Sequence, residues 1–152
     1  MEIYLLRHAE SLFNIGESDE RDIELSINGI SQAKLLTGYY DIIICSPLRR
    51  CLDTLNYSKI TFDTLIIEPL VREQIVENSD LMVNEIRGFE TEFELLERID
   101  MFKNKLNLMP NDKKILIIGH SDYFWHLTSY TFVGLRFGKW IKNAEIIRLE
   151  QN

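Results

Sequence analysis

The stretch Ile3-Tyr4-Leu5-Leu6-Arg7-His8-Ala9-Glu10-Ser11 contains a short apolar run that ends directly on a cation and an imidazole. Four apolar residues without alternation are too few for a helix and are typical of a strand that is buried on both faces. Ligands of parallel sheets bind beyond the carboxyl ends of the strands. We therefore predict that Arg7 and His8 stand at the exit of a buried strand, where a ligand can bind.

A second stretch repeats this arrangement later in the chain. In Lys113-Lys114-Ile115-Leu116-Ile117-Ile118-Gly119-His120-Ser121-Asp122 an apolar run again ends on a histidine, and the intervening glycine permits a tight turn. Two of the three histidines of the chain thus occupy equivalent places at two strand ends. A packing need does not explain that placement.

Length and composition limit the class of protein. The 152 residues are enough for one domain with a proper core but hardly for two, so we predict a single domain over residues 1–152. Hydrophobic residues make up 45% and charged residues 27% of the chain, as in soluble globular proteins. No apolar run approaches the ~18 residues that span a bilayer, and no secretory signal is visible, so we expect no membrane partner.

The cysteines and the net charge narrow the choice further. Cys45 and Cys51 form neither a disulfide framework nor a zinc pattern, which fits a reducing, cytoplasmic compartment. The net charge of −7 argues against a nucleic-acid partner. It is compatible with a local cationic pocket, because the field inside a cleft is set by the nearest charges.

Strand-like runs alternate with helical patterns along the chain. We expect strands at residues 3–6, 41–45, 64–67, 113–118 and 144–149, the last at a sheet edge. Helices are expected from Ser26 to before Gly38, from Ser46-Pro47 onward, and over 90–108 and 122–133, with a short one possible in 10–15; residues 16–22 and 74–85 read as loops, and 134–138 as a turn. This order predicts an α/β fold of three layers, α/β/α, with a mainly parallel sheet.

The apolar faces of two helices can be assigned from their spacing. The first helix is expected to bury Ile27, Ile30, Leu35 and Leu36. The helix over 90–108 is expected to bury Phe93, Leu96, Ile99, Met101, Phe102 and Leu106.

The helix that follows Ser46-Pro47 carries Arg49 and Arg50 in its first turn. Serine at an N-cap with proline at the first helical position favours a helix start. Arginine is out of place there, because the positive end of the helix dipole favours anions. A bound anion near this turn would explain the cation.

Five charged or imidazole side chains follow four of the predicted strands. They are Arg7, His8, Arg50, Glu73 and His120. Since the exits of parallel strands face one edge of the sheet, one cleft would hold two guanidinium groups, two imidazoles and one carboxylate. Such a set suits a tetrahedral oxyanion such as phosphate, with the carboxylate as proton donor.

The sequence lacks the features of nucleotide-dependent phosphoryl transfer. There is no second carboxylate cluster for magnesium and no glycine-rich phosphate loop, which argues against a kinase or a nucleotide hydrolase. Because the cationic groups are side chains, we expect neither a metal nor a cofactor.

Over nearly its whole length the chain resembles the histidine phosphatase superfamily, which includes the phosphoglycerate mutases. The resemblance rests on six motifs in the order of the family: Leu6-Arg7-His8-Ala9-Glu10-Ser11 with Asn14, Leu25-Ser26 with Gly29 and Gln32-Ala33, Ser46-Pro47-Leu48 with Arg50 and Thr54, Leu70-Val71-Arg72-Glu73, Gly119-His120-Ser121, and Asn143-Ala144-Glu145-Ile146. It implies a phosphoglycerate mutase-like fold.

The resemblance implies catalytic roles for three residues. His8 would be the nucleophile, transiently phosphorylated on a ring nitrogen, and Glu73 would protonate the leaving oxygen and later activate water. His120 would bind phosphoryl oxygens beside the nucleophile. An imidazole attacks only when neutral, and a backbone carbonyl bonded to its other nitrogen would fix the required tautomer.

Four further residues would bind the substrate. By the same resemblance, Arg7 and Arg50 would clamp the phosphoryl oxygens, Asn14 would add a donor at the pocket edge, and Ser121 would stand next to the second histidine. These groups supply the positioning and charge stabilisation on which phosphoryl transfer depends.

The sequence departs from the usual family pattern in three places. Ala9 and Ser121 replace glycines, and each is expected to narrow the pocket. After Glu73 the chain lacks the Trp-Glu-Gly-like run of the family, which leaves Glu77 as the alternative acid. Glu73 would then be a salt-bridge partner of Arg72.

These expectations describe a metal-independent phosphatase acting on a phosphorylated small molecule or a phosphoprotein. A phosphohistidine protein phosphatase, a phosphoglycerate mutase and a weakly active member that binds a phosphorylated ligand are the alternatives. Mutases of the family usually carry inserted segments that cap the site, so the short connections here favour hydrolysis. The sequence predicts no particular oligomeric state.

Overall fold

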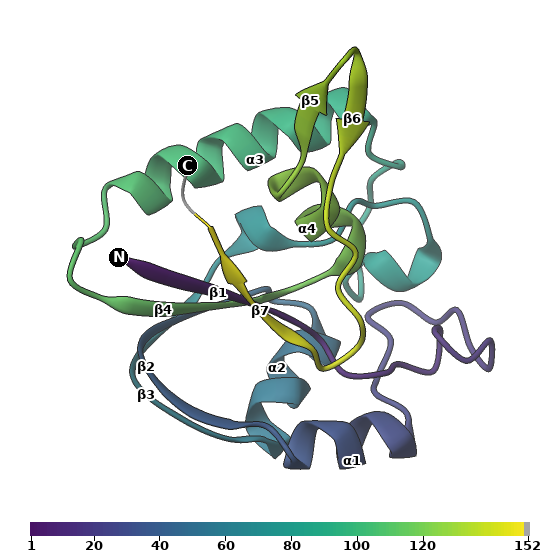
Figure 1. Ribbon diagram of the computed structural model, residues 1–152. Helices are drawn as coiled ribbons and strands as arrows, with labels where there is room; N and C mark the ends of the chain where they lie inside the picture. The colour runs from purple at the N-terminus through teal and green to yellow at the C-terminus, as the bar shows by residue number, and fades with distance from the viewer. Residues whose placement is uncertain (151–152) are drawn as a thin grey trace.

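The computed structural model, which describes residues 1–150, is built on a five-stranded sheet with the order β3-β2-β4-β1-β7 (Figure 1). Its strands are β1 (Glu2–Arg7), β2 (Thr37–Cys45), β3 (Lys59–Ile67), β4 (Lys114–Gly119) and β7 (Ile146–Leu149). Four of them run parallel, and β7 pairs antiparallel with β1 at the edge. The predicted mainly parallel sheet and its closing edge strand are confirmed.

Helices cover both faces of this sheet, as predicted. Figure 1 shows α1 (Ile27–Lys34) and α2 (Arg49–Tyr57) on one face and α3 (Glu92–Asn107) and α4 (Ser121–Leu127) on the other. The fold therefore has the three layers expected from the alternation of strands and helices. None of the helices described has the length and hydropathy needed to cross a membrane.

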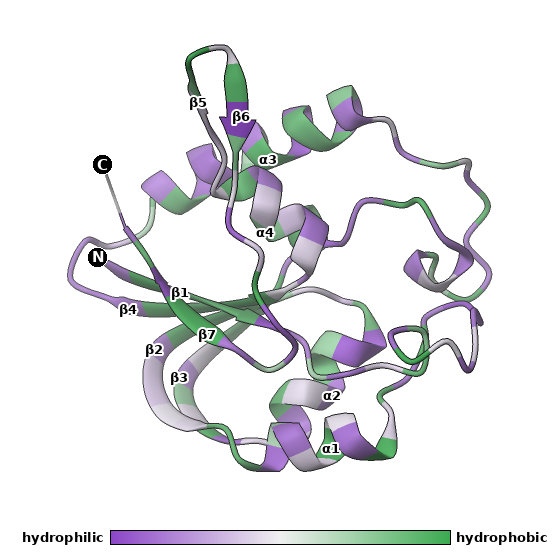
Figure 2. Cartoon of the chain, turned by 45° about the vertical axis from the view of Figure 1, so that its right-hand side comes forward, coloured by the Kyte–Doolittle hydropathy of each residue, from purple (hydrophilic) through white to green (hydrophobic). Residues whose placement is uncertain are grey.

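The central strand β4 shows why its sequence is a continuous apolar run. Ile115 and Ile117 pack into the core under α3 and α4, whereas Leu116 and Ile118 pack into the core beside α2. All four are fully buried. Successive side chains of a strand point to opposite faces, so a strand covered on both sides is apolar at every position. The same continuity is visible in the green central strands of Figure 2.

The second and third strands begin earlier than predicted. Thr37 pairs with Lys59, so β2 and β3 each start several residues before the apolar runs. Gly38, predicted to lie just past the first helix, belongs to β2 with a φ of 132°. The helix itself already ends at Lys34. Backbone hydrogen bonds between β2 and β3 at this edge make both strands longer than the apolar runs from which they were predicted.

The N-cap of α1 is confirmed, and Ile30 and Leu36 pack against the core as predicted, but Ile27 and Leu35 are exposed. Ser26 Oγ accepts a hydrogen bond from Gly29 N at 3.0 Å, as an N-cap should. The helix buries Gly29 and Ala33, and Ile27 is 86% exposed. A Cβ on Gly29 would come within 2.0 Å of the carbonyl oxygen of Glu10, so α1 approaches the neighbouring backbone through its smallest residues.

The other helices also differ in detail. The second helix starts at Arg49, two residues after Pro47. The third is capped by Thr91 in a capping box with Glu94. It buries Leu95, Ile99, Phe102 and Leu106, and leaves the predicted core residues Phe93 and Met101 exposed.

The helix predicted over 122–133 ends at Leu127 and gives way to a hairpin. Strands β5 (Tyr130–Phe132) and β6 (Leu135–Phe137) form it, projecting from the body of the protein in Figure 1. Val133 and Gly134 between them have φ values of 51° and 73°. Two positive φ values are what a two-residue type I′ hairpin turn requires, and a helix cannot pass through them.

Two loops lie at the edge of the sheet where the parallel strands end. Residues 10–15 form turns, so the predicted short helix is absent there. The segment after β3 contains two short 3-10 helices, η1 (Pro69–Val71) and η2 (Asn78–Asp80), within an otherwise irregular path. The loop predicted over 74–85 is thus largely confirmed.

Candidate active site

The strand exits meet as the sequence predicts. Arg7 pairs with Gly119 in the parallel ladder, so His8 and His120 follow on neighbouring strands. Their ring centres lie 5.3 Å apart. A cavity of about 150 Å³ opens beside them, lined by six of the seven predicted site residues: Arg7, His8, Asn14, Arg50, Glu73 and Ser121. The seventh, His120, is fully buried next to His8 and does not line the cavity.

His8 is held in one tautomer. Its Nδ1 lies 2.7 Å from the carbonyl oxygen of Ala9, which can only accept, so Nδ1 carries the proton and donates it. The lone pair is therefore on Nε2. Burial, and then the charge of Arg50, hold the pKa of His8 well below its usual value, so the ring stays neutral near pH 7. A neutral imidazole with a bare Nε2 has the form of a nucleophile.

One ring nitrogen of His120 is buried without a hydrogen-bond partner in the described part of the chain. The other, Nε2, lies 2.9 Å from Ser46 Oγ and 3.4 Å from Cys51 Sγ, each of which carries a proton that it can donate. When either group donates to Nε2, the ring proton is on Nδ1. This buried Nδ1 has no hydrogen-bond partner within residues 1–150. Burial, and then Arg50, lower the pKa of His120 well below its usual value.

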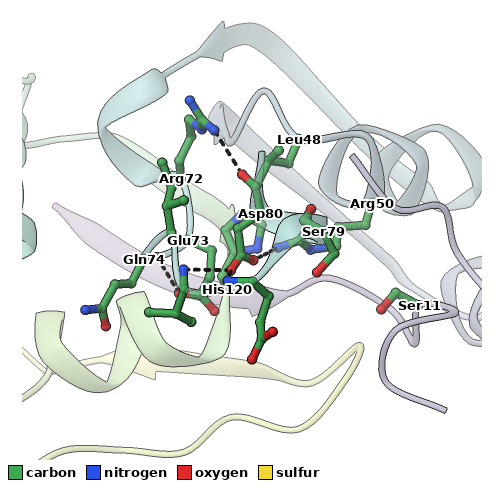
Figure 3. Close-up of polar contacts among 12 residues, drawn as sticks. Ser11, Leu48, Arg50, Arg72, Glu73, Gln74, Ser79, Asp80 and His120 are labelled. Atoms are coloured by element: carbon green, nitrogen blue, oxygen red, sulfur yellow. Dashed lines mark hydrogen bonds and ion pairs between the residues drawn. The ribbon is translucent and has the colours of Figure 1, made fainter. Parts of the chain in front are cut away.

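The two predicted clamp arginines differ in how much of each guanidinium is bound. Arg7 donates from Nη1 to the carbonyl oxygen of Ile141 at 3.0 Å, and its buried Nε has no partner in the part of the chain described. Arg50 is bound by the segment after β3: Nη1 donates to Ser79 O at 3.0 Å, and Nη2 lies 3.0 Å from Asp80 Oδ1. Figure 3 shows Arg50 and Asp80 pointing toward one another.

Arg49 lies outside this site. Its half-exposed side chain pairs with Glu24 at 3.1 Å and Asp53 at 3.3 Å. Arg50, one position later, is buried and lines the cavity. A step of one residue turns a helix by about 100°, which separates the two guanidinium groups.

Asn14 offers its amide N–H₂ group to the cavity. Its Oδ1 accepts from Ser11 N at 2.9 Å, from Ser11 Oγ at 3.0 Å and from Asn143 Nδ2 at 3.2 Å. Three donors around one atom identify that atom as the oxygen and leave the nitrogen for a ligand. The position agrees with a donor at the pocket edge.

The carboxylate of Glu73 is buried at the start of α4. Oε1 accepts from Tyr123 N at 2.8 Å and from Gln74 N at 3.0 Å, and Oε2 accepts from Asp122 N at 3.2 Å. Burial, and then the charges of Asp122 and Asp80, raise the pKa of Glu73 to about 7. An acid with such a pKa holds its proton in a substantial fraction of molecules at neutrality, as a general acid must.

Arg72 is not the partner of Glu73. Its Nη2 lies 2.8 Å from Glu85 Oε2. The same Nη2 lies 2.9 Å from the carbonyl oxygen of Asp80 (Figure 3). The alternative in which Glu73 serves as a salt-bridge partner of Arg72 is therefore wrong. Glu77, the alternative acid, also lines the cavity and is exposed.

The two substitutions near the histidines behave differently. Ala9 packs with Leu25 and Ala33, and its N–H donates to Thr54 Oγ1 at 2.9 Å. Its methyl group does not line the cavity, so the expectation that it narrows the pocket is wrong. Ser121, by contrast, does line the cavity.

Sequence reasoning missed Arg98, which positions the segment carrying Glu73. Its guanidinium donates to the carbonyl oxygens of Leu70 at 2.8 Å, Arg72 at 2.7 Å and Glu73 at 3.3 Å. The same group binds Glu90 in a bidentate pair at 2.7 and 3.0 Å. A lone arginine in a helical pattern carries no signal of such a role, because its partners come from a loop far away in the sequence.

Two acidic residues of the cavity were also missed. Asp80 closes η2 by accepting from Val76 N at 3.2 Å and Glu77 N at 3.0 Å, besides pairing with Arg50. Asp122 lines the cavity from the first turn of α4. Its place directly after the Gly119-His120-Ser121 motif was the available signal. Within residues 1–150 no three His, Cys, Asp or Glu residues are grouped to hold one metal ion.

Solved structures share this fold. A phosphoserine phosphatase of Entamoeba histolytica, in complex with 3-phosphoglyceric acid, is 19% identical with a TM-score of 0.62, over 97% of this chain and 89% of its own. A mycobacterial glucosyl-3-phosphoglycerate phosphatase is 18% identical with a TM-score of 0.65, over 97% and 90%. The alpha-ribazole phosphatase of Shigella flexneri is 15% identical with a TM-score of 0.64, over 92% and 95%.

At the level of sequence, no curated protein matches the chain. The family model of the histidine phosphatase superfamily (branch 1) matches residues 3–87, a stretch that contains His8, Arg50 and Glu73. Motifs, fold and strand-exit geometry agree with that match. The chain belongs to the histidine phosphatase superfamily.

Proposed function

We propose that this protein is a metal-independent phosphatase that hydrolyses a phosphomonoester through a phosphohistidine intermediate on His8. The single observation that carries the proposal is the bond from His8 Nδ1 to the carbonyl oxygen of Ala9. It leaves the Nε2 lone pair free in a ring whose pKa is lowered, so that the ring is neutral and able to attack phosphorus.

In the first step, His8 Nε2 attacks the phosphorus in line with the ester oxygen. A P–N bond forms and the P–O ester bond breaks, while Glu73 gives its proton to the departing oxygen. Arg7 Nε and the Nδ1–H of His120, both without partners among residues 1–150, supply donors for the phosphoryl oxygens. Arg50 adds a buried positive charge.

In the second step, water attacks the phosphorus of the phosphohistidine and gives a proton to the Glu73 carboxylate. The P–N bond breaks, inorganic phosphate leaves, and neutral His8 and protonated Glu73 are restored. A pKa near 7 lets Glu73 serve as acid and then as base.

The cavity supports a phosphorylated small molecule over a phosphoprotein as substrate. Its volume is about 150 Å³, below the roughly 300–1,000 Å³ of pockets for drug-sized ligands. The three solved relatives are named for phosphoserine, glucosyl-3-phosphoglycerate and alpha-ribazole phosphate chemistry. A phosphohistidine protein as substrate, a phosphoglycerate mutase reaction and ligand binding without turnover are the alternatives. Cysteine usage supports a cytoplasmic location.

Substitution of His8 tests the mechanism. Wild-type protein, quenched during turnover of para-nitrophenyl phosphate, should carry acid-labile, base-stable phosphate, and His8→Ala should carry none and lose phosphatase activity while remaining folded. The matched control is His126→Ala, which removes the third histidine, on α4 and outside the cavity. Full activity of purified His8→Ala would refute the proposal.

A further inference from the structure

The cavity is lined by more carboxyl groups than the proposed phosphatase mechanism uses. Besides Glu73, which is protonated when the ester binds, they are Glu77, Asp80 and Asp122, against two guanidinium groups. One of these, that of Arg50, is already paired with Asp80 at 3.0 Å. A phosphomonoester dianion adds two further negative charges. Negatively charged carboxylates repel a bound dianion and weaken its binding unless a cation lies between or beside them.

Asp122 is a carboxylate of the cavity that no cation of the described chain contacts, because the charge of Arg7 acts on it only at longer range. It is half-buried, and within residues 1–150 no hydrogen bond or ion pair engages its carboxylate. Its backbone N–H donates to Glu73 Oε2 at 3.2 Å, which places the side chain next to the acid that meets the leaving oxygen. Burial, and then the charge of Asp80, raise the pKa of Asp122, and the charges of His126 and Arg7 lower it by less.

Independent observations fix the orientation of a ligand in this cavity. The buried Nδ1 of His120, in a ring 5.3 Å from that of His8, and the buried Nε of Arg7 are donors without partners in the described chain. Both stand at the exits of β4 and β1, so the phosphoryl group belongs there. Asp122 lines the same cavity and is hydrogen-bonded through its backbone to Glu73, so the part of a substrate beside the leaving oxygen can reach its carboxylate.

The chemistry of the acidic side fits an organic cation. A single half-buried carboxylate suits an ammonium group, which offers three donors in any direction. Phe13 lines the same cavity and adds an aromatic face, which also attracts cations. The small volume leaves room for only a few atoms between the phosphoryl group and the cation.

We infer that the substrate is a small phosphomonoester whose alcohol carries an ammonium group, with Asp122 binding that group beside the phosphoryl site. This inference rests on the proposed phosphatase function and names the substrate class of the same site. Asp122 is accordingly a specificity-determining residue that acts on the leaving group, and its effect on the pKa of Glu73 is common to all esters and cancels in a ratio of two of them.

Three small phosphate esters of similar length, whose alcohol ends in a positive, a neutral or a negative group, test the inference. Ethanolamine phosphate carries an ammonium, 2-hydroxyethyl phosphate is its neutral analogue and 2-phosphoglycolate carries a carboxylate. Wild-type kcat/KM should favour the ammonium ester over the neutral one by roughly tenfold or more, as a charge-assisted hydrogen bond provides, and should be lowest for the carboxylate. In Asp122→Asn the ratio of ammonium to neutral ester should fall to within about threefold of one. Asp100→Asn, on the exposed face of α3, is the matched control and should keep the wild-type ratio.

The outcomes separate the inference from the proposed function. Equal or better turnover of the neutral ester by wild-type protein, or an unchanged ratio in Asp122→Asn, would overturn the inference and leave the phosphatase standing. If none of the three esters nor para-nitrophenyl phosphate is hydrolysed, the phosphatase and the inference fail together. If Asp122→Asn does not fold, the wild-type ratio of kcat/KM for the ammonium ester to that for the neutral ester still tests the inference. Asp122→Glu keeps the charge and should retain the preference for the ammonium ester.

Discussion

Asp80 Oδ1 lies 3.0 Å from Arg50 Nη2, and both side chains are almost fully buried. Arg50 comes from the first turn of α2, and Asp80 from η2 in the segment after β3. The other Nη of Arg50 donates to Ser79 O. The arginine at the exit of β2 is therefore already bound to an internal anion, and a phosphoryl group must share Arg50 with this carboxylate or replace it.

Removing the charge of Asp80 should strengthen anion binding. In Asp80→Asn the repulsion between carboxylate and phosphate is gone, while the amide oxygen can still accept from Val76 N and Glu77 N. We expect the inhibition constant of inorganic phosphate, measured against para-nitrophenyl phosphate, to fall roughly tenfold. Asp53→Asn, which breaks the exposed pair with Arg49, should leave it unchanged. Weaker inhibition in Asp80→Asn would mean that Asp80 orients Arg50 for the phosphoryl group.

The two adjacent arginines should differ in their effect on catalysis. Arg50→Ala removes a buried charged donor of the cavity, and kcat/KM should fall by roughly 10²-fold or more. Arg49→Ala, which loses only exposed ion pairs, should change kcat/KM by less than about threefold. Arg50→Ala alone leaves the buried carboxylate of Asp80 without a partner, which can itself impair folding. The double variant Arg50→Ala/Asp80→Asn removes that charge, and its near-ultraviolet circular dichroism shows whether the protein folds without Arg50. Equal losses in the two single variants would show that the clamp is assigned to the wrong residue.

The proton donor can be identified by varying the leaving group. Glu73→Gln should slow hydrolysis of alkyl phosphates by ~10²-fold or more, because an alkoxide leaves poorly without a proton. Para-nitrophenyl phosphate should be slowed far less, since nitrophenolate needs no proton. Glu77→Gln is the matched variant and should show no such contrast. If the contrast appears only in Glu77→Gln, the acid lies four residues further on; equal slowing of both ester classes by Glu73→Gln would make Glu73 a positioning residue.

The raised pKa of Glu73 predicts how this residue changes stability with pH. Its pKa is about 7 in the folded protein against an ordinary 4.5. The folded state thus holds the proton more tightly, so the stabilisation is complete below about pH 4.5 and is lost as the pH rises through about 7. Glutamine does not titrate. The free energy of unfolding of Glu73→Gln, minus that of wild type, should therefore be larger at pH 8 than at pH 5.

Urea unfolding at the two pH values measures this difference, which can reach at most ~1.4 kcal/mol per pH unit. The lowered pKa values of His8 and His120 act in the opposite sense, because those rings resist protonation as the pH falls. Both proteins contain these histidines, so their contribution cancels in the comparison. A difference that shrinks toward pH 8 would contradict the raised pKa of Glu73.

The sequence predicted the structure best in the strands that are buried on both faces, because such strands must be apolar at every position. An apolar run covered on both faces is continuous, and a charged residue can follow only where the strand leaves the sheet. That rule located β1 and β4 and brought His8 and His120 together. The tautomer of His8 was also predictable, because a histidine that must act as a nucleophile needs its other nitrogen bonded to an acceptor.

The hydrophobic pattern led to wrong predictions where the structure depends on a close approach of two backbones or on contacts between distant parts of the chain. Ile27 reads as core, yet Gly29 sets the distance of α1 from its neighbour and turns Ile27 to solvent. The aromatic run after α4 reads as a helix, yet the turn at Val133-Gly134 makes a hairpin of it. The pairing of Asp80 with Arg50 depends on the path of a loop, which no local periodicity encodes.

The hydrogen bonds of Arg98 connect the candidate site to a helix that does not line the cavity. Helix α3 contributes no residue to the cavity, but through Arg98 it holds the backbone on either side of Glu73. Replacement of Arg98 is therefore expected to displace the carboxylate of Glu73 without changing any residue of the cavity lining. The family match over residues 3–87 contains His8 and Glu73 but not Arg98. A change confined to α3 is thus expected to alter turnover while every residue that lines the cavity stays the same.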